Sequence, residues 1–171
     1  MYNYISAEEA VYTVKSGNRV FFHGSACTPN YLIDELARQS HRLDKVEMVS
    51  ITQQGNVEIA KPEYKDKFFV NSLFVSSPVR DAVNSERGDF VPVFLSEIPI
   101  LFRKNILPLD VAFITVSPPD KHGFCTLGTS VDVARAAVDT APTIVAIVNP
   151  LMPRTHGDGM IHISRIHKLV W

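Results

Sequence analysis

Four segments of this sequence combine residue types that bind small ligands. They cover residues 24–29, 53–56, 117–130 and 149–159. Glycines let a backbone approach a ligand closely, and a helix N-terminus directly after such a segment offers free N–H groups to an anion. The neutral amide of Gln54 suits recognition of a phosphate, a carbonyl or another amide. The same residues also form ordinary turns, so composition alone leaves a structural role open for each segment.

Ionisable residues in the last two segments add further chemistry. Arg154 can hold a carboxylate or a phosphate with both arms of its guanidinium. Asp120 with His122 suits acid–base work, although a solvated turn is the preferred explanation for His122. His156 and Asp158 are too few to make a metal site, so no metal is expected. The sequence lacks the GxGxxG, P-loop, HExxH and GxSxG patterns, which argues against a serine hydrolase.

Apolar runs that alternate with amphipathic segments predict the elements that position these residues. Strands are predicted at 19–23, 46–51, 90–94, 111–116 and 143–148, with one or two more within 67–75 and an edge strand at 161–166. Thr28 is predicted to cap a helix that has Pro29 at its first position, and Ser130 is predicted to cap a later helix. Alternating strands and helices imply an α/β fold with a mostly parallel sheet and helices on both faces. Ligands gather at the carboxyl ends of parallel strands, so the four segments should meet at one edge.

Composition narrows the class of protein. The 171 residues are 46% apolar and 20% charged, which fits one globular domain. A formal net charge of −1 argues against a nucleic-acid-binding protein. No apolar run is long enough to span a membrane, and the first ten residues do not resemble a signal peptide, so a cytoplasmic location is expected. Cys27 and Cys125 lie far apart and predict no disulfide framework.

Three motifs carry a resemblance to a known family. They are VFFHGS at 20–25 followed by Thr28-Pro29, SPPDKHGF at 117–124 followed by Leu127-Gly128, and VNP at 148–150 followed by MPRT at 152–155 and Gly157. Their order and their spread over nearly the whole chain resemble the N-terminal half of the acetyl-CoA hydrolase/transferase family, especially its 4-hydroxybutyrate CoA-transferase branch.

The resemblance implies residues 1–171 to be the N-terminal domain of an enzyme with two similar α/β halves. Such enzymes move CoA between an acyl-CoA and a small carboxylic acid through a glutamyl-CoA thioester, with no permanently bound cofactor. The nucleophilic glutamate belongs to the C-terminal half, which is absent from this chain. None of the eight glutamates present matches a nucleophile motif, so no catalytic residue is assigned and the fragment alone is expected to be inactive.

The resemblance also implies partners and a site. The C-terminal half of the same protein and a second copy in a homodimer are the expected macromolecular partners, with no nucleic acid and no membrane. Residues expected to face the acyl site between the halves are Gly24, Ser25, Gln54, Asn149, Met152 and Arg154.

Two other functions stay open from the sequence. The chain could be a complete, non-catalytic small-molecule binding module that uses the same segments. It could also be an isomerase of the related sugar-phosphate fold, which would need several basic residues at the strand ends. Only Arg154 is well placed for that purpose.

Overall fold

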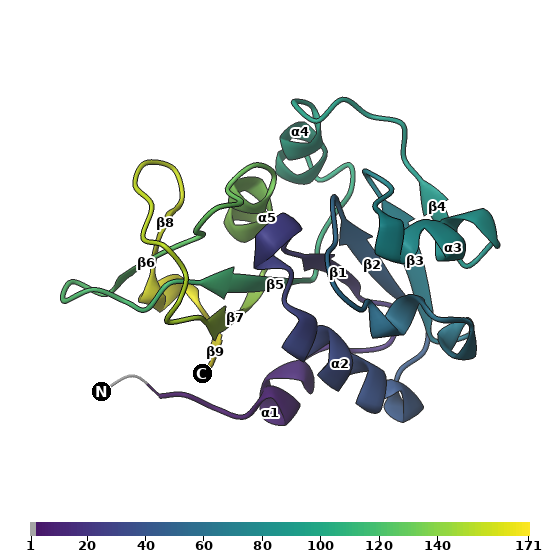
Figure 1. The fold of residues 1–171 in the computed structure, drawn as a ribbon, viewed down its shortest axis with the longest axis horizontal. Helices are drawn as coiled ribbons and strands as arrows, with labels where there is room; N and C mark the ends of the chain where they lie inside the picture. Colours follow the sequence, from purple (N-terminus) through teal and green to yellow (C-terminus); the bar gives the residue numbers. More distant parts are fainter. Residues whose placement is uncertain (1–2) are drawn as a thin grey trace.

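A seven-stranded parallel sheet forms the centre of the computed structural model, which describes residues 3–171. The spatial order is β4-β3-β2-β1-β5-β7-β9, and each neighbouring pair is parallel. The strands are β1 (Arg19–Phe22), β2 (Val46–Ser50), β3 (Phe68–Ser72), β4 (Gly88–Phe90), β5 (Val111–Val116), β7 (Thr143–Val148) and β9 (Lys168–Val170). A separate antiparallel pair, β6 (Phe124–Thr126) and β8 (Met160–His162), lies beside the sheet (Figure 1).

Helices cover both faces of the sheet (Figure 1). The α-helices are α1 (Ala7–Val11), α2 (Asn30–Arg38), α3 (Arg80–Asn84), α4 (Ile98–Arg103) and α5 (Ala134–Thr140). Short 3-10 turns occur at Ser25–Cys27, Ser40–Arg42, Glu58–Ala60, Pro62–Tyr64, Ser77–Val79 and Ile163–Arg165. Helices α1, α2 and α3 share one apolar cluster with the sheet, and α4 and α5 share the other.

Alternation along the strands divides the core between the two faces. Phe22 packs edge-on against Phe113 in the first cluster, whereas Phe21 packs edge-on against Phe102 of α4 in the second. Successive side chains of a strand point to opposite faces, so the three consecutive apolar residues Val20–Phe22 of β1 are buried on both faces. Each fully buried phenylalanine contributes about 1.5–3 kcal/mol through removal of apolar area from water.

The order of the strands creates a switch point between β1 and β5. The chain builds outward from β1 through β2, β3 and β4, then crosses to the other side of β1 to build β5, β7 and β9. Helices α2 and α5, which follow β1 and β5 along the chain, therefore pack on opposite faces of the sheet. In parallel α/β sheets, ligands bind at the carboxyl ends of the strands beside such a switch point. The predicted parallel sheet and the strands near 19–23, 46–51, 111–116 and 143–148 are confirmed.

Several local predictions were wrong at the ends of elements. Strand β4 ends at Phe90, so most of the expected strand at 90–94 is a loop. Of the expected edge strand at 161–166, only the first residues are a strand, which is β8 of the small second sheet, and a 3-10 turn follows them. The edges of the main sheet are β4 and β9. Helix α2 starts at Asn30 without a side-chain cap, because the Thr28 hydroxyl instead donates to the Ser25 carbonyl.

Helix α5 begins later than its predicted cap at Ser130. The Asp132 carboxylate accepts from the N–H groups of Val133 and Ala134, at 2.6 and 3.3 Å, and thereby satisfies the first free donors. By contrast, Ser6 caps α1 with its side chain, because its hydroxyl oxygen accepts from the N–H of Glu9 at 3.1 Å.

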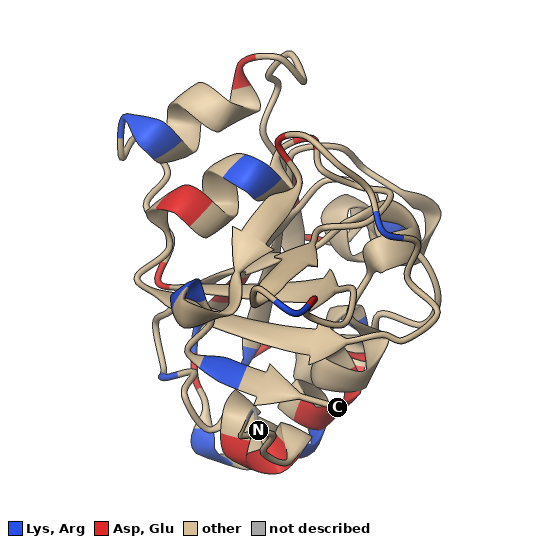
Figure 2. Cartoon of the chain, turned by 90° about the vertical axis from the view of Figure 1, so that its left-hand side faces the viewer, with Lys and Arg blue, Asp and Glu red and all other residues tan. Residues whose placement is uncertain are grey.

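Charges of both signs are interspersed on the helices and loops around the sheet (Figure 2). Within residues 3–171, no helix combines the length and the apolar character needed to cross a membrane.

Candidate functional site at the carboxyl edge of the sheet

The loop after β1 is held in an unusual backbone conformation. Ser25 has a φ of +54°, a region that costs a residue with a Cβ about 1–2 kcal/mol. Its N–H donates to the carbonyl of Thr52 at 2.6 Å, and its Oγ lies 2.7 Å from Thr52 Oγ1. A Cβ on Gly24 would stand 3.0 Å from that same carbonyl, so glycine permits the close approach. Together, these contacts place two hydroxyls side by side at the ends of β1 and β2.

Thr28 connects this loop to the segment after β2. Its Oγ1 donates to the Ser25 carbonyl at 2.7 Å and accepts from the Gln54 N–H at 3.1 Å. The Gln54 side chain is exposed, whereas that of Gln53 is buried and donates to the His23 carbonyl at 3.0 Å. The prediction that the first two segments meet is therefore confirmed. Of the two adjacent amides, the Gln53 side chain is buried and links the segment to β1, and the Gln54 side chain is exposed.

His23 joins β1 to the region after β5. The ring is fully buried, with Nδ1 3.2 Å from the Thr115 N–H and Nε2 2.6 Å from the Ser130 carbonyl. Because the Thr115 N–H can only donate, Nδ1 must accept, and the proton sits on Nε2 and points to Ser130. Burial lowers the pKa of His23, which favours this neutral form. No pattern in the sequence indicates this role of His23.

The third and fourth segments are tied to the first. Cys27 Sγ lies 3.6 Å from Thr129 Oγ1, and the Thr155 hydroxyl donates to the Gly128 carbonyl at 2.9 Å. Gly128 has a φ of +66°, and a Cβ there would overlap the sulfur of Met152. Met152 is thus buried against a glycine that cannot be replaced freely. All four segments form one connected edge, as predicted.

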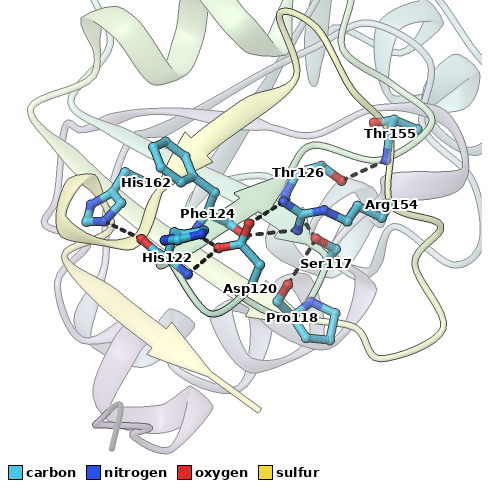
Figure 3. A network of polar contacts seen from close by, with 9 residues as sticks. All are labelled: Ser117, Pro118, Asp120, His122, Phe124, Thr126, Arg154, Thr155 and His162. Carbon is cyan, nitrogen blue, oxygen red and sulfur yellow. Dashed lines mark hydrogen bonds and ion pairs between the residues drawn. The ribbon is translucent and has the colours of Figure 1, made fainter.

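Arg154 is engaged within its own chain (Figure 3). One arm of the guanidinium donates to Asp120 Oδ2 at 2.7 Å and the other to the Phe124 carbonyl at 3.0 Å. Asp120 Oδ1 accepts from the N–H groups of Phe124 and His122. These contacts, led by the Phe124 N–H, lower the pKa of Asp120. Asp120 thus closes a turn and orients Arg154.

His162 and Asn149 make further local contacts in that region. His162 Nε2 lies 3.2 Å from the His122 carbonyl, and its ring packs edge-on against Phe124. Asn149 Oδ1 accepts from the Leu151 N–H at 2.9 Å and stabilises the turn after β7. Among the described residues, no set of His, Cys, Asp or Glu side chains could hold a metal ion. Burial raises the pKa of the Cys125 thiol to about 11, so it is a poor nucleophile at neutral pH.

A cavity of about 350 Å³ opens beside Ser25 at the carboxyl ends of β1, β2 and β3. Ser25, Thr52 and Asp132 supply its polar groups. Its apolar lining comes from Ile51, Leu73, Phe74, Val93, Leu95 and Ile98. Of the predicted site residues, only Ser25 lines this cavity. Asn149, Met152 and Arg154 lie after β7, on the other side of the switch point.

Sequence reasoning missed most of the cavity. Phe74 and Leu95 are 57% and 59% exposed, which is unusual for large apolar side chains. The apolar run at 90–95 carries this signal, although the same run also fits the strand predicted at 90–94. Its residues instead form the loop that leads to α4.

Comparison with known proteins gives a consistent picture. The model of the acetyl-CoA hydrolase/transferase N-terminal domain matches residues 1–170. A succinyl-CoA:acetate/propanoyl-CoA:succinate CoA transferase from Fasciola hepatica is 44% identical over 163 residues, which are 94% of this chain and 34% of that protein. A 4-hydroxybutyrate coenzyme A transferase from Clostridium kluyveri is 40% identical over 166 residues, which are 97% of this chain and 39% of that protein.

A solved structure supports the same relationship. The crystal structure of a 4-hydroxybutyrate CoA-transferase from Porphyromonas gingivalis matches with a TM-score of 0.80 and 30% sequence identity. The match covers 97% of this chain and 38% of that structure. The chain thus spans well under half the length of the relatives it matches. Because the family model covers residues 1–170, the chain belongs to the acetyl-CoA hydrolase/transferase family, of which it forms the N-terminal domain.

Proposed function

We propose that the whole protein transfers CoA from an acyl-CoA to a small carboxylic acid. The family match over residues 1–170 carries this proposal, because relatives in that match are named CoA transferases. The connected carboxyl edge supports it, since a crevice at a topological switch point is where α/β sheets bind ligands. The substrates are then acyl-CoA and the free acid, and no permanently bound cofactor takes part.

The proposed reaction uses a glutamate that lies outside residues 1–171. Its carboxylate attacks the carbonyl of acyl-CoA, the acyl group leaves as the free acid, and the enzyme keeps CoA as a glutamyl thioester. A second acid then takes the CoA by the reverse steps. Residues 1–171 contribute the binding surface for the acyl group, and the C-terminal half contributes the nucleophile. In the same proposal the enzyme is a homodimer.

Within this domain, the six expected site residues have different tasks. Ser25, held by Gly24 and Thr52, presents a hydroxyl at the cavity where the acyl group binds. Gln54 offers an exposed amide, and its backbone N–H is bound by Thr28 of the loop after β1. On the other side of the switch point, Asn149, Met152 and Arg154 shape the loop after β7. Their local contacts with Leu151, Gly128 and Asp120 support that shaping task.

The sugar-phosphate isomerase alternative finds no support at this edge. Such a site requires several cations at the strand ends to hold a phosphate. Among the described residues, those that line the cavity are apolar, hydroxylic or acidic. Arg154 already holds Asp120 and the Phe124 carbonyl.

Activity of the whole protein tests the proposal. The full-length protein and a fragment of residues 1–171 are each incubated with acetyl-CoA and butyrate, and the acyl-CoA products are separated by chromatography. We expect butyryl-CoA from the full-length protein only. Turnover by the fragment that is abolished by one glutamate substitution within it would contradict the proposed division of labour.

A further inference from the structure

The cavity beside Ser25 has a mostly apolar lining that includes two neighbouring hydroxyls. Its six apolar side chains come from the loops after β2, β3 and β4 and from the first turn of α4. Ser25 and Thr52 supply the neutral polar groups, with their hydroxyls 2.7 Å apart. One end of a ligand can therefore form hydrogen bonds, while the rest is surrounded by hydrocarbon.

The only ionisable side chain among the cavity-lining residues in the described part of the chain is acidic. It belongs to Asp132, whose carboxylate accepts from the Ser130 hydroxyl at 2.5 Å and from the Val133 N–H at 2.6 Å. These two hydrogen bonds orient the Asp132 carboxylate, which is part of the cavity lining. A second carboxylate on a bound acid would be repelled by Asp132 and would find no cation in the lining to pair with.

Arg154 does not supply a cation to this cavity. Its guanidinium lies on the far side of the switch point and is held by Asp120. Removing an unpaired carboxylate from water into an apolar site is strongly unfavourable, whereas a methyl group gains from the same transfer. The transfer free energies of a terminal methyl group and a terminal carboxylate therefore differ in sign, and this difference favours acyl groups that end in a methyl group.

We propose that this cavity selects acyl groups of aliphatic monocarboxylic acids and rejects those of dicarboxylic acids. The inference rests on the proposed function, because it takes the cavity as the place where the acyl chain binds. It separates this protein from a relative such as the Fasciola hepatica enzyme, whose name specifies succinyl-CoA as a substrate.

A matched pair of acids tests the selectivity. Butyrate and succinate both contain four carbons and differ in a terminal methyl group against a second carboxylate. With the full-length protein and acetyl-CoA as donor, we expect kcat/KM for butyrate to exceed that for succinate by about tenfold or more. Equal values, or a preference for succinate, would overturn the proposal.

Two arginine substitutions at neighbouring positions locate the selectivity. Leu95→Arg adds a cation to the lining, and Phe94→Arg adds the same charge at an adjacent residue that does not line the cavity. Both side chains are more than half exposed, so both variants should fold. Leu95→Arg should reduce the preference for butyrate about tenfold, and Phe94→Arg should leave it unchanged. Equal effects of the two variants would show that the cavity does not select the acid.

A binding measurement separates this inference from the proposed transferase activity. Saturation-transfer NMR of free butyrate and free succinate, with wild-type and Leu95→Arg protein, reports the cavity without any turnover. Selective binding of butyrate by a protein that transfers no CoA would contradict the proposed function and support the selectivity of the cavity. Equal saturation of the two acids would overturn the selectivity, whatever the activity.

Discussion

At the scale of single residues, a buried neutral histidine joins the two sides of the switch point between β1 and β5. His23 accepts from Thr115 and donates to Ser130, so its ring must stay uncharged for both bonds to persist. Burial lowers its pKa from 6.5 in the folded chain. Below pH 6.5 the His23 ring takes up a proton in the unfolded chain but not in the folded chain. The stability that depends on neutral His23 is therefore fully present above pH 6.5 and is lost as pH falls toward the folded-state pKa.

We therefore expect the free energy of unfolding to fall as pH is lowered from 7 to 5, by up to about 1.4 kcal/mol per pH unit. His23→Gln should remove most of this slope, whereas substitution of the exposed His156 should not. Unfolding in denaturant across this range measures the slope. Nitrogen-15 NMR should show His23 protonated on Nε2 alone, and a ring that titrates near 6.5 would refute the account.

Arg154 provides a second test at this scale. Lysine keeps the charge but cannot bind Asp120 and the Phe124 carbonyl with two fixed arms. We expect Arg154→Lys to lower kcat/KM of the full-length enzyme by about tenfold, the scale of one lost charge-assisted hydrogen bond. If Arg154 acts by holding its loop, Asp120→Asn should cause a similar loss, and the double variant should be no worse than either. Additive losses would instead indicate that Arg154 binds substrate directly.

At the scale of elements, glycines in the left-handed region differ in what surrounds them. Gly17 and Gly128 both have positive φ, but a Cβ on Gly17 meets nothing within 4 Å, whereas one on Gly128 overlaps Met152. Gly17→Ala should therefore cost about 1 kcal/mol from backbone strain alone. Gly128→Ala should cost about 2 kcal/mol or more, because Met152 and its loop must also move.

Denaturation of the two variants measures this difference. The double variant Gly128→Ala/Met152→Ala should be less destabilised than the sum of the two single variants, since the smaller side chain leaves room for the new methyl group. Equal costs for the two glycine variants would show that Met152 and its loop move aside freely.

The sequence predicted the central elements well and their ends poorly, for physical reasons. Strands such as β5 and β7 are buried on both faces, so their sequences are nearly continuous apolar runs. Such runs are typical of buried strands and are therefore easy to recognise. The helix caps at Thr28 and Ser130 were wrong because both side chains found other partners after folding: the Ser25 carbonyl for Thr28 and Asp132 for Ser130. A cap depends on such competition, which local sequence does not reveal.

At the scale of the whole molecule, the candidate site is made by topology. Residues 25, 52, 74, 95 and 132 come from five separate connections, and they meet because parallel strands end at one edge. Sequence could therefore predict the edge but not the cavity. Its lining depends on which loop folds over which strand end. The three-motif resemblance correctly identified the family because those motifs include the loops after β1, β5 and β7.

The central claim is that this domain binds the acyl group while a glutamate outside it carries the CoA. The most direct test is to incubate the full-length protein with acyl-CoA, trap the covalent intermediate, and map the CoA adduct by mass spectrometry of peptides. The account predicts a glutamyl-CoA thioester on one glutamate beyond residue 171. An adduct on any of the eight glutamates within residues 1–171, or no adduct in a protein that actively exchanges CoA, would contradict it.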